Sequence, residues 1–465
     1  MMSKAKRLAR ILSYGIFWSR SSRQRFRAQP RGWILGVWKW IVYYSLKTVP
    51  RFHGERLVER RLSILGVPVF VRRRERNKYR IALLVDEFFG GWDTAIGGYG
   101  ALARKYICRF IPDDRIQIDL LLDVNGAGKV QQKVVDETTI YRLPRHPVRR
   151  QRWLDKQGYD LFLSIEMTWP SFEILRDYET NVPLLYWIQD PRDLKIYQPR
   201  QRTVNLIRDG DWSYINDVSV WMQEIMKQRR VSFISQGESL SAIAREMYQI
   251  PESVPIQDLA NPVEIDCSYQ LGDPPKENSI IFLGRLEAQK RVWIVCEVAK
   301  AMPQYEFYVL GATGKGRDEA ANSKVLEPYR NADGSSKIRN LHFTGHLDGD
   351  AKNFRVKTAK VLLNTSIWEG IAVSWLEALS YGTLIVSAFD RDNIVGRHGT
   401  FVGEVMGDGT DPADIKKFSD AIEYWMTHAL ERNSTAQKAI EFVRARHSIE
   451  SFTSNMRSAI LGAIQ

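Results

Sequence analysis

Short apolar runs recur along the chain and alternate with segments of helical spacing. Residues 79–85 contain five consecutive apolar residues without helical spacing, which predicts a buried β-strand. The same reasoning predicts strands at residues 116–122, 161–165, 184–188, 213–215 and 232–235, and helices at residues 99–110 and 238–248. Alternation of this kind predicts a parallel sheet covered by helices on both faces.

A second series of the same kind begins at Ser279, with strands predicted at residues 305–310, 341–343, 361–365 and 384–387. The two series join near residues 261–277, where three prolines cluster with polar residues. We therefore expect two doubly wound α/β domains, at residues 79–270 and 271–445. Ligands of such sheets bind beyond the carboxyl ends of the strands, so two facing domains create a cleft between those ends.

Composition separates a basic extension from this body. The chain has 465 residues, of which 44% are hydrophobic and 26% charged, as in folded globular proteins. Its net charge is +13. Residues 1–80 hold 21 Lys or Arg and 3 Glu, whereas the remaining residues hold 46 basic and 51 acidic residues. The basic excess therefore belongs to the extension, which we place at residues 1–78.

Within this extension, residues 33–46 are apolar apart from Lys39 and are rich in Trp and Tyr. Fourteen residues are too few to cross a bilayer, which takes about 20. Aromatic rings flanked by cations are typical of segments that lie among anionic headgroups, so we expect peripheral attachment to an anionic membrane surface. Two alternatives remain: a helix packed on the first domain, or nucleic-acid binding, although no nucleic-acid motif accompanies the segment.

The first 18 residues resemble the start of a signal peptide, but arginines follow directly without a cleavage site. Three widely spaced cysteines, Cys108, Cys267 and Cys296, suit reduced thiols better than a disulfide framework. We therefore expect a cytoplasmic protein attached to the inner face of the membrane.

Two carboxylates, Glu369 and Glu377, are separated by seven residues where a predicted strand gives way to a predicted helix. If that helix begins near Gly370, the carboxylates lie about 80° apart around its axis and up to about 12 Å along it. They would then suit an elongated polar ligand bound at two places, such as a nucleotide sugar. The alternative is a carboxylate favoured by the helix dipole and a solvated helix residue.

The residues around this pair resemble the donor-binding signature of the family 4 retaining glycosyltransferases. Glu369 and Glu377 are followed by Gly382 and an apolar strand, and the run from Gly284-Arg285 to Lys290 is similar to the family's Gly-Arg-Leu run ending in Lys. Further matches follow in the family's order at residues 261–263, 309–311 and 343–345. The resemblance covers roughly residues 79–460 and implies the GT-B fold, with an acceptor domain, a donor domain and a last helix, at residues 446–465, crossing back.

Two cations, Arg285 and Lys290, lie five residues apart in the loop after the first strand of the second domain. Sugar transfer builds negative charge on the departing phosphate, and fixed cations stabilise that charge in the transition state. The resemblance assigns both cations to the donor diphosphate. Solvated surface charge is the alternative.

For the donor, the resemblance implies that Glu369 binds the sugar hydroxyls, that Glu377 binds the ribose, and that Gly284 and Gly370 belong to the same site. It implies that the amides of Ile371, Ala372 and Val373 meet the diphosphate at a helix start. The family usually has Gly-Phe-Gly after its first Glu, where this chain has Gly370-Ile371-Ala372. An amide donor needs only its N–H, so Ala372 should be tolerated.

In the first domain, Gly97 and Gly98 precede a predicted helix and would let the backbone approach the donor closely. A plain flexible loop is the alternative. Many family members carry a His-Asp pair where this chain has Gln189 and Asp190. Gln189 cannot act as a base, but Asp190 could orient a substrate, or it could simply cap a turn.

We therefore interpret the chain as a retaining, metal-independent sugar transferase without a cofactor. It would move a sugar from a nucleotide-diphosphate sugar to a glycan or lipid-linked acceptor in surface polysaccharide or glycolipid synthesis. No His or Cys spacing indicates zinc. The alternatives are a nucleotide-sugar epimerase of the same fold and an inactive basic scaffold or nucleic-acid-binding protein.

Deleting residues 1–50 should abolish binding to anionic liposomes, because the deletion removes most of the aromatic and basic residues of the extension. Sedimentation with liposomes checks this. Unchanged sedimentation of the shortened chain would rule out attachment through the extension.

Overall fold

The computed structural model describes residues 78–88, 92, 94, 97–126, 128–208, 210–313 and 319–465, and the backbone of residues 57–64 and 67–74. These residues form two units. The smaller unit contains an antiparallel pair, β1 (Leu57–Ile64) and β2 (Val67–Arg74), and the helix α6 (Pro147–Gln157). The aromatic segment at residues 33–46 lies outside the described residues, so its membrane role stays a prediction.

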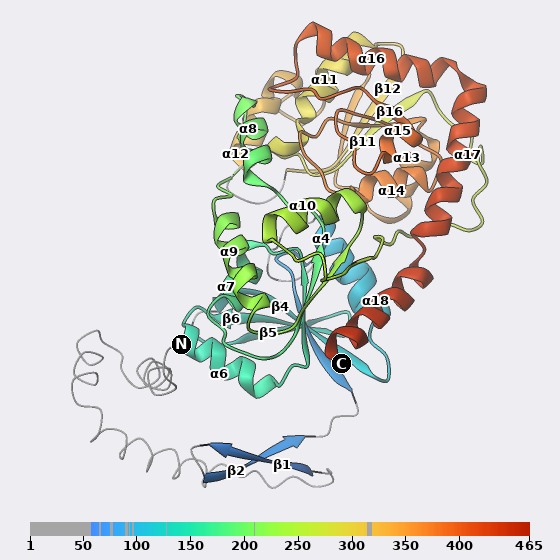
Figure 1. The fold of residues 1–465 in the computed structure, drawn as a ribbon. Helices are drawn as coiled ribbons and strands as arrows, with labels where there is room; N and C mark the ends of the chain where they lie inside the picture. Colours follow the sequence, from blue (N-terminus) through green and yellow to red (C-terminus); the bar gives the residue numbers. More distant parts are fainter. Residues whose placement is uncertain are drawn as a thin grey trace. The chain divides into compact units, whose positions relative to one another are not determined.

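The larger unit begins with an eight-stranded sheet (Figure 1). Its strand order is β10-β9-β8-β7-β3-β4-β6-β5, and each neighbouring pair is parallel except β5 with β6. The strands are β3 (Tyr79–Leu84), β4 (Ile116–Gly126), β5 (Gln131–Val135), β6 (Thr138–Pro144), β7 (Leu161–Ile165), β8 (Leu184–Ile188), β9 (Val231–Ser235) and β10 (Ile256–Asp258).

The central strands of this sheet are buried along their length. Every residue of β7 and β8 is buried, as is the apolar part of β3. Helices on both faces exclude water from such strands, which explains continuous apolar runs without alternation. The helical segments between these strands are α4 (Gly98–Ala101), the π-helical η1 (Leu102–Ile107), α5 (Cys108–Phe110), α7 (Trp169–Leu175), α8 (Leu194–Thr203), α9 (Tyr214–Met226) and α10 (Glu238–Tyr248).

The strand predicted at residues 213–215 is wrong, because these residues begin helix α9. Val218, Met222 and Ile225 are the buried residues of this helix, and their spacing places them on one helical face. An apolar run of three residues is too short to distinguish a strand from the first turn of a helix. The longer helical pattern decides the conformation.

The hairpin of β5 and β6 was not predicted. Its two-residue turn consists of Asp136 and Glu137, which both have positive φ, at 48° and 64°. Turns with two left-handed residues match the twist of the flanking strands, but their usual sequence signal is Asn-Gly or Asp-Gly. Asp-Glu does not carry that signal, so the sequence did not reveal the turn.

The second sheet has six parallel strands in the order β13-β12-β11-β14-β15-β16, which is the 3-2-1-4-5-6 order of a dinucleotide-binding fold. They are β11 (Ser279–Leu283), β12 (Glu306–Leu310), β13 (Leu341–Gly345), β14 (Val361–Asn364), β15 (Leu384–Ser387) and β16 (Gly399–Phe401). The helical segments are η2 (Ala288–Lys290), α11 (Val292–Ala301), α12 (Glu319–Leu326), η3 (Glu327–Tyr329), α13 (Gly349–Thr358), α14 (Val373–Leu379), α15 (Ile394–Arg397), α16 (Pro412–Thr427), α17 (Ala429–Arg446) and α18 (Ile449–Ile464).

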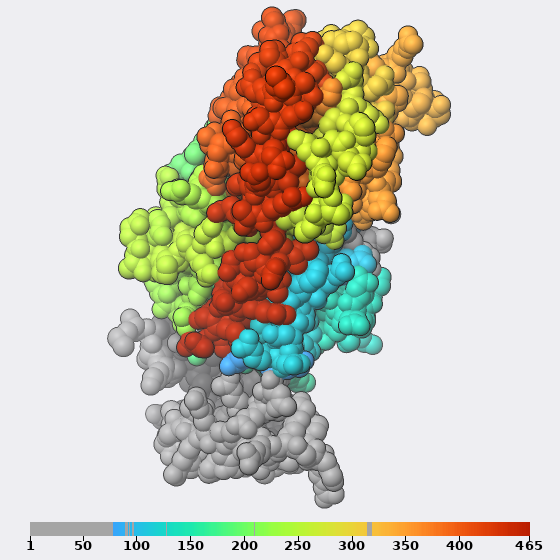
Figure 2. All heavy atoms as spheres, turned by 90° about the vertical axis from the view of Figure 1, so that its right-hand side faces the viewer, coloured from blue at the N-terminus to red at the C-terminus, as the bar shows by residue number. Residues whose placement is uncertain are grey.

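The last helix, α18, returns to the first sheet. Its residues Phe452, Met456 and Ile460 are buried in the core that also contains strands β3, β7 and β8. The ring of Phe452 stacks on Trp187 of β8, with 5.6 Å between ring centroids. Figure 2 shows this C-terminal segment lying beside the helical residues near position 105.

The chain crosses between the two sheets twice, and the two crossings are bonded to each other. The amide of Val263 donates to the carbonyl of His447 at 3.0 Å, and Nδ1 of His447 lies 2.7 Å from the carbonyl oxygen of Asn261. The predicted α/β class with two Rossmann-like domains is confirmed. Among the helices that the structure describes, none is long and apolar enough to span a membrane.

Replacing Phe452 with Ala should lower the free energy of unfolding by about 3–5 kcal/mol, because it leaves a cavity beside Trp187. Chemical denaturation measures the change. Leu430→Ala is the control: Leu430 is 89% exposed, so the change should stay within about 0.5 kcal/mol. Equal unfolding curves for the two variants would contradict the packing of α18 on the first sheet.

Candidate functional site

The candidate residues lie where the strand order of each sheet reverses. In the second sheet this point falls between β11 and β14, and the loops after these strands carry Arg285, Lys290 and Glu369. In the first sheet it falls between β3 and β7, which are followed by Glu87 and Glu166. Ligands of doubly wound sheets bind at such points, so the topology alone marks these loops as a candidate site.

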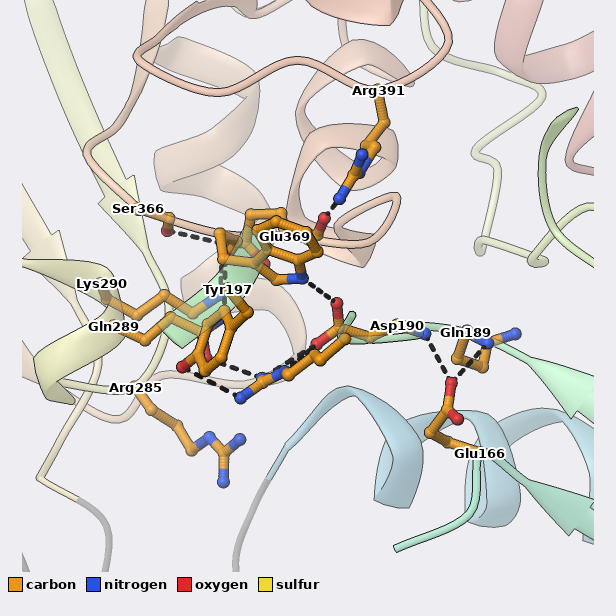
Figure 3. Close-up of polar contacts among 12 residues, drawn as sticks. Glu166, Gln189, Asp190, Tyr197, Arg285, Gln289, Lys290, Ser366, Glu369 and Arg391 are labelled. Carbon is orange, nitrogen blue, oxygen red and sulfur yellow. Dashed lines mark hydrogen bonds and ion pairs between the residues drawn. The ribbon is translucent and has the colours of Figure 1, made fainter. Parts of the chain in front are cut away.

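The structure brings Lys290 and Glu369 together. Nζ of Lys290 lies 2.5 Å from Oε1 of Glu369, which also accepts a hydrogen bond from Oγ of Ser366 (Figure 3). The same oxygen accepts from Nδ2 of Asn364. Glu369 is only 5% exposed. Its second oxygen, Oε2, has no hydrogen bond to any described residue. One oxygen is thus held by the protein, and the other is left to accept from a ligand.

Gly370, directly after this carboxylate, lies where the two sheets approach each other closely. A Cβ at this position would overlap the carbonyl oxygen of Gln189, which follows β8, and would lie 3.2 Å from Nε2 of Gln236. Nε2 of Gln236 in turn donates to the same carbonyl at 2.7 Å. The glycine is therefore required by the interdomain contact.

Asp190 contacts the Glu369 loop from the first sheet. Its Oδ1 accepts a hydrogen bond of 2.8 Å from the indole Nε1 of Trp368. Trp368 is 2% exposed, and the guanidinium of Arg391 lies 4.6 Å from its ring. Nε of Arg391 donates to the carbonyl of Glu369 at 3.0 Å. Asp190 therefore helps to fix the segment that carries the site carboxylate.

A second bridge between the sheets runs through Arg192. Its guanidinium donates to Oδ2 of Asp190 at 2.9 Å and to Oε1 of Gln289 at 2.8 Å, and lies 3.9 Å from the ring of Trp212. Nε2 of Gln289 donates to the carbonyl of Trp368 at 2.6 Å. Arg192 and Gln289 were not predicted from the sequence. Their only signal was proximity to Asp190 and Lys290 along the chain.

Glu166 holds the backbone of the Gln189–Asp190 segment. Its Oε2 accepts from the amides of Gln189 and Asp190 at 3.0 and 2.7 Å, and Oε1 accepts from the hydroxyl of Tyr186. Burial raises the pKa of Glu166 above its usual value. Glu166 was not predicted from the sequence, although an acid directly after a buried strand is a usable signal.

Arg285 forms an ion pair with a carboxylate of the first sheet and not with Glu369, the partner of Lys290. Its Nη1 lies 3.0 Å from Oε1 of Glu87 and 3.2 Å from Oε1 of Glu287, and its side chain is 33% exposed. Oε2 of Glu87 accepts from the amide of Gly100 at 3.2 Å. A Cβ on Gly97 would overlap this carboxylate, which gives Gly97 a packing reason. Glu87 was not predicted.

The neighbour of Glu87, Asp86, has an unusual carboxyl group. Its Oδ1 is buried and has no hydrogen bond to any residue that the structure describes. Burial, with a further contribution from the charge of Glu87, raises the pKa of Asp86 to about 7. The Arg285 side of the site thus contains a buried carboxyl group whose charged form is disfavoured.

The helix after Glu369 begins later than predicted. α14 starts at Val373 with Ala372 as its N-cap residue, so Glu369 precedes the helix and the predicted 80° separation of the two carboxylates does not apply. Gly370 and Ile371 form the bend between Glu369 and the start of the helix. Extended backbone at Ala372, with φ −67° and ψ 128°, ends the turn before the helix.

Glu377 lies on helix α14, which follows the loop that carries Glu369. Its Oε1 accepts from Nζ of Lys352 at 2.7 Å, and its side chain is 23% exposed. The amides of Ile371, Ala372 and Val373 make no hydrogen bond to described residues. These three amides can therefore donate hydrogen bonds to a ligand. The second carboxylate oxygen of Glu377 can accept one.

The remaining predicted glycines differ in their surroundings. A Cβ on Gly284 would be in ordinary contact with Phe282 at 3.6 Å, whereas Gly98 has open space around it. Among the residues that the structure describes, no group of three or more metal-binding side chains occurs.

Residues 268–442, which contain most of these loops, match the family model described as glycosyl transferases group 1. This part of the chain is similar to the group 1 glycosyltransferases. The match includes β11, β14 and the loops with Arg285, Lys290, Glu369 and Glu377. The family was therefore predicted correctly, at the level of the group.

Solved structures of glycosyltransferases share the fold of the whole larger unit. Sucrose-phosphate synthase from Thermosynechococcus elongatus aligns with a TM-score of 0.62 and 16% identity, covering 83% of this chain and 99% of that one. HepE from Anabaena, in complex with UDP-glucose, aligns with a TM-score of 0.56 and 12% identity, covering 82% of this chain and 99% of that one. A glycosyltransferase from Rickettsia africae aligns with a TM-score of 0.53 and 14% identity, covering 84% of this chain and 100% of that one. The fold is GT-B. A comparison with curated proteins finds no match.

Replacing Gly370 with Ala should lower the rate of sugar transfer, the activity expected from the sequence, at least about tenfold, because the added methyl displaces the Glu369 loop from the carbonyl of Gln189. Steady-state kinetics with an accepted nucleotide sugar measures the effect. Gly462→Ala is the control, because a Cβ there meets no atom within 4 Å. Wild-type turnover of Gly370→Ala would show that the close approach does not matter for the reaction.

Proposed function

We propose that the protein is a retaining, metal-independent glycosyltransferase that uses a nucleotide-diphosphate sugar and needs no cofactor. The observation that carries the proposal is the Lys290–Glu369 pair, in which a cation and a half-satisfied carboxylate meet at the strand reversal of a group 1 glycosyltransferase domain. HepE, which shares the fold, was solved with UDP-glucose. The likeness supports the choice of donor class.

In the proposed reaction, the bond between the anomeric carbon and the donor phosphate breaks. The acceptor hydroxyl forms the new bond on the same face of that carbon, and its proton passes to an oxygen of the leaving phosphate. Negative charge therefore grows on the diphosphate. Arg285 and Lys290 would stabilise it, together with the unpaired amides of Ile371, Ala372 and Val373, because fixed donors are effective where water is excluded.

In this proposal, the two carboxylates bind the uncharged parts of the donor. Oε2 of Glu369 would accept from a sugar hydroxyl, and Glu377 would accept from the ribose. Gly97, Gly98, Gly284 and Gly370 would let the backbone come close to the donor. Asp190 would act by positioning the Glu369 loop through Trp368. No side chain of the site needs to serve as a general base, which fits Gln189 at the place where many relatives have His.

The acceptor in this proposal is a glycan or a lipid-linked sugar of a surface polysaccharide or glycolipid. The basic aromatic extension at residues 1–78 supports it, since attachment to the inner face of a membrane would bring the enzyme to a lipid-linked substrate.

Lys290→Ala should reduce turnover about 100-fold or more, because it removes a cation from the developing phosphate charge. The assay measures nucleotide release from a panel of nucleotide sugars, with acceptor and a metal chelator present. Lys416→Ala is the matched control: its side chain is 73% exposed and paired only with Asp420 on the same helix. Equal rates for Lys290→Ala and Lys416→Ala would remove the diphosphate assignment, and no release from any donor would remove the proposed activity.

A further inference from the structure

Glu377 repeats, on a second pair of elements, the arrangement found at Glu369. Nζ of Lys352 lies 2.7 Å from Oε1 of Glu377, as Nζ of Lys290 lies 2.5 Å from Oε1 of Glu369. In each pair the second carboxylate oxygen has no hydrogen bond to a described residue. Each carboxylate thus has one oxygen held by a lysine and one oxygen left for a ligand. Lys352 was not predicted from the sequence.

The Lys352–Glu377 pair joins two neighbouring helices and is shielded from water. Lys352 lies near the start of α13, and Glu377 lies on α14. Their side chains are 13% and 23% exposed. Exposed ion pairs fix a geometry weakly because water screens their charges, whereas a partly buried carboxylate that accepts from a charged donor is held strongly. This pair can therefore fix the rotamer of Glu377.

A second acid also acts on Lys352. Asp348 is the N-cap residue of α13 and accepts from the amide of Gly349 at 2.9 Å and from Nζ of Lys105 at 3.1 Å. Burial opposes its ionisation, but these hydrogen bonds and the charges of Lys105 and Lys352 together lower the pKa of Asp348 below its usual value. The ammonium group of Lys352 thus lies in the field of two carboxylates, Asp348 and Glu377.

The contact of Asp348 with Lys105 suggests a competing interpretation. Lys105 belongs to η1, which packs on the first sheet, so its bond to Asp348 crosses between the two sheets. In a purely structural role, Lys352 would only add charge beside this crossing contact, and its loss would weaken the binding of every nucleotide by the same factor. Positioning of Glu377 instead predicts a loss confined to ligands whose hydroxyl group meets the carboxylate.

We propose that Lys352 is a positioning residue for the recognition of the donor ribose. By binding Oε1, it directs Oε2 of Glu377 toward the ribose hydroxyl groups and keeps the carboxylate in that rotamer before the donor arrives. One carboxylate oxygen has two lone pairs, so Oε2 can accept from both neighbouring hydroxyl groups. Such preorganisation lowers the cost of binding. The inference rests on the proposed function, which assigns Glu377 to the ribose.

This role differs from that of the site cations. Arg285 and Lys290 would meet negative charge that grows during transfer, whereas the ribose is unchanged by the reaction. Interactions that are equal in the bound donor and in the transition state change donor affinity and leave the rate at saturating donor unchanged. Lys352 should therefore act on donor affinity, and above all on the discrimination between ribose and 2′-deoxyribose.

The test is a calorimetric titration of the full-length chain with UDP, CDP, ADP and GDP and with the 2′-deoxy form of each. The wild-type chain should bind at least one ribonucleotide at least about tenfold more tightly than its 2′-deoxy form, because the latter lacks a hydrogen bond to a charged group. Lys352→Met keeps an apolar stem and removes the charge. It should reduce this ratio to about threefold or less and change the affinity for the 2′-deoxy form by less than about threefold.

Two further variants locate the effect. In a chain that already carries Glu377→Gln, Lys352→Met should have no further effect on the ratio, because the carboxylate that it positions is gone. Lys357→Met is the matched control. It removes a 2.8 Å ion pair with Asp266 from the same helix, and it should leave the ratio at its wild-type value.

An unchanged ratio in Lys352→Met overturns the inference. So does an equal loss of affinity for the ribonucleotide and its 2′-deoxy form, which is the result of a purely structural role. Neither result affects the proposed activity, since the wild-type chain still binds nucleotides. Equal binding of the two forms by the wild-type chain overturns the inference together with the assignment of Glu377 to the ribose. No saturable binding of any of these nucleotides overturns the proposed donor class as well.

Discussion

The site depends on a contact that leaves no room for a side chain, between Gly370 of one sheet and the carbonyl oxygen of Gln189 of the other. This close approach sets the indole of Trp368 against Asp190 and holds the loop with Glu369 in place. Glu166 supports it from the first sheet by binding the amides of Gln189 and Asp190. Because hydrogen bonds tolerate little displacement, the whole arrangement follows from this single packing constraint.

Ion pairing explains why the two site cations can be partly buried. Each is matched by a carboxylate: Lys290 by Glu369 on its own sheet, and Arg285 by Glu87 on the opposite one. Pairing offsets the desolvation cost of partly buried charges. A diphosphate that reaches these cations would compete with the carboxylates, so donor binding and the contact between the sheets would influence each other.

The two chain crossings complete this picture. Asn261 and Val263 of the first crossing are bonded to His447 of the second, so the covalent links between the sheets form one bonded unit. α18 then anchors the second crossing in the core of the first sheet. Relative motion of the sheets must pass through this unit.

The sequence by itself determined the class of fold, most strands and the group 1 family, because buried strands, turns and loop motifs are local patterns. It also named Lys290, Glu369 and Gly370, which carry a motif. It missed the β5–β6 hairpin, whose Asp136-Glu137 turn lacks the usual signal, and it began α14 too early. Only the tertiary structure decided that Glu87 meets Arg285 and that Arg192 meets Gln289, since these partners lie 198 and 97 residues apart. Contacts between distant segments are set by how the sheets pack, and no local pattern encodes that.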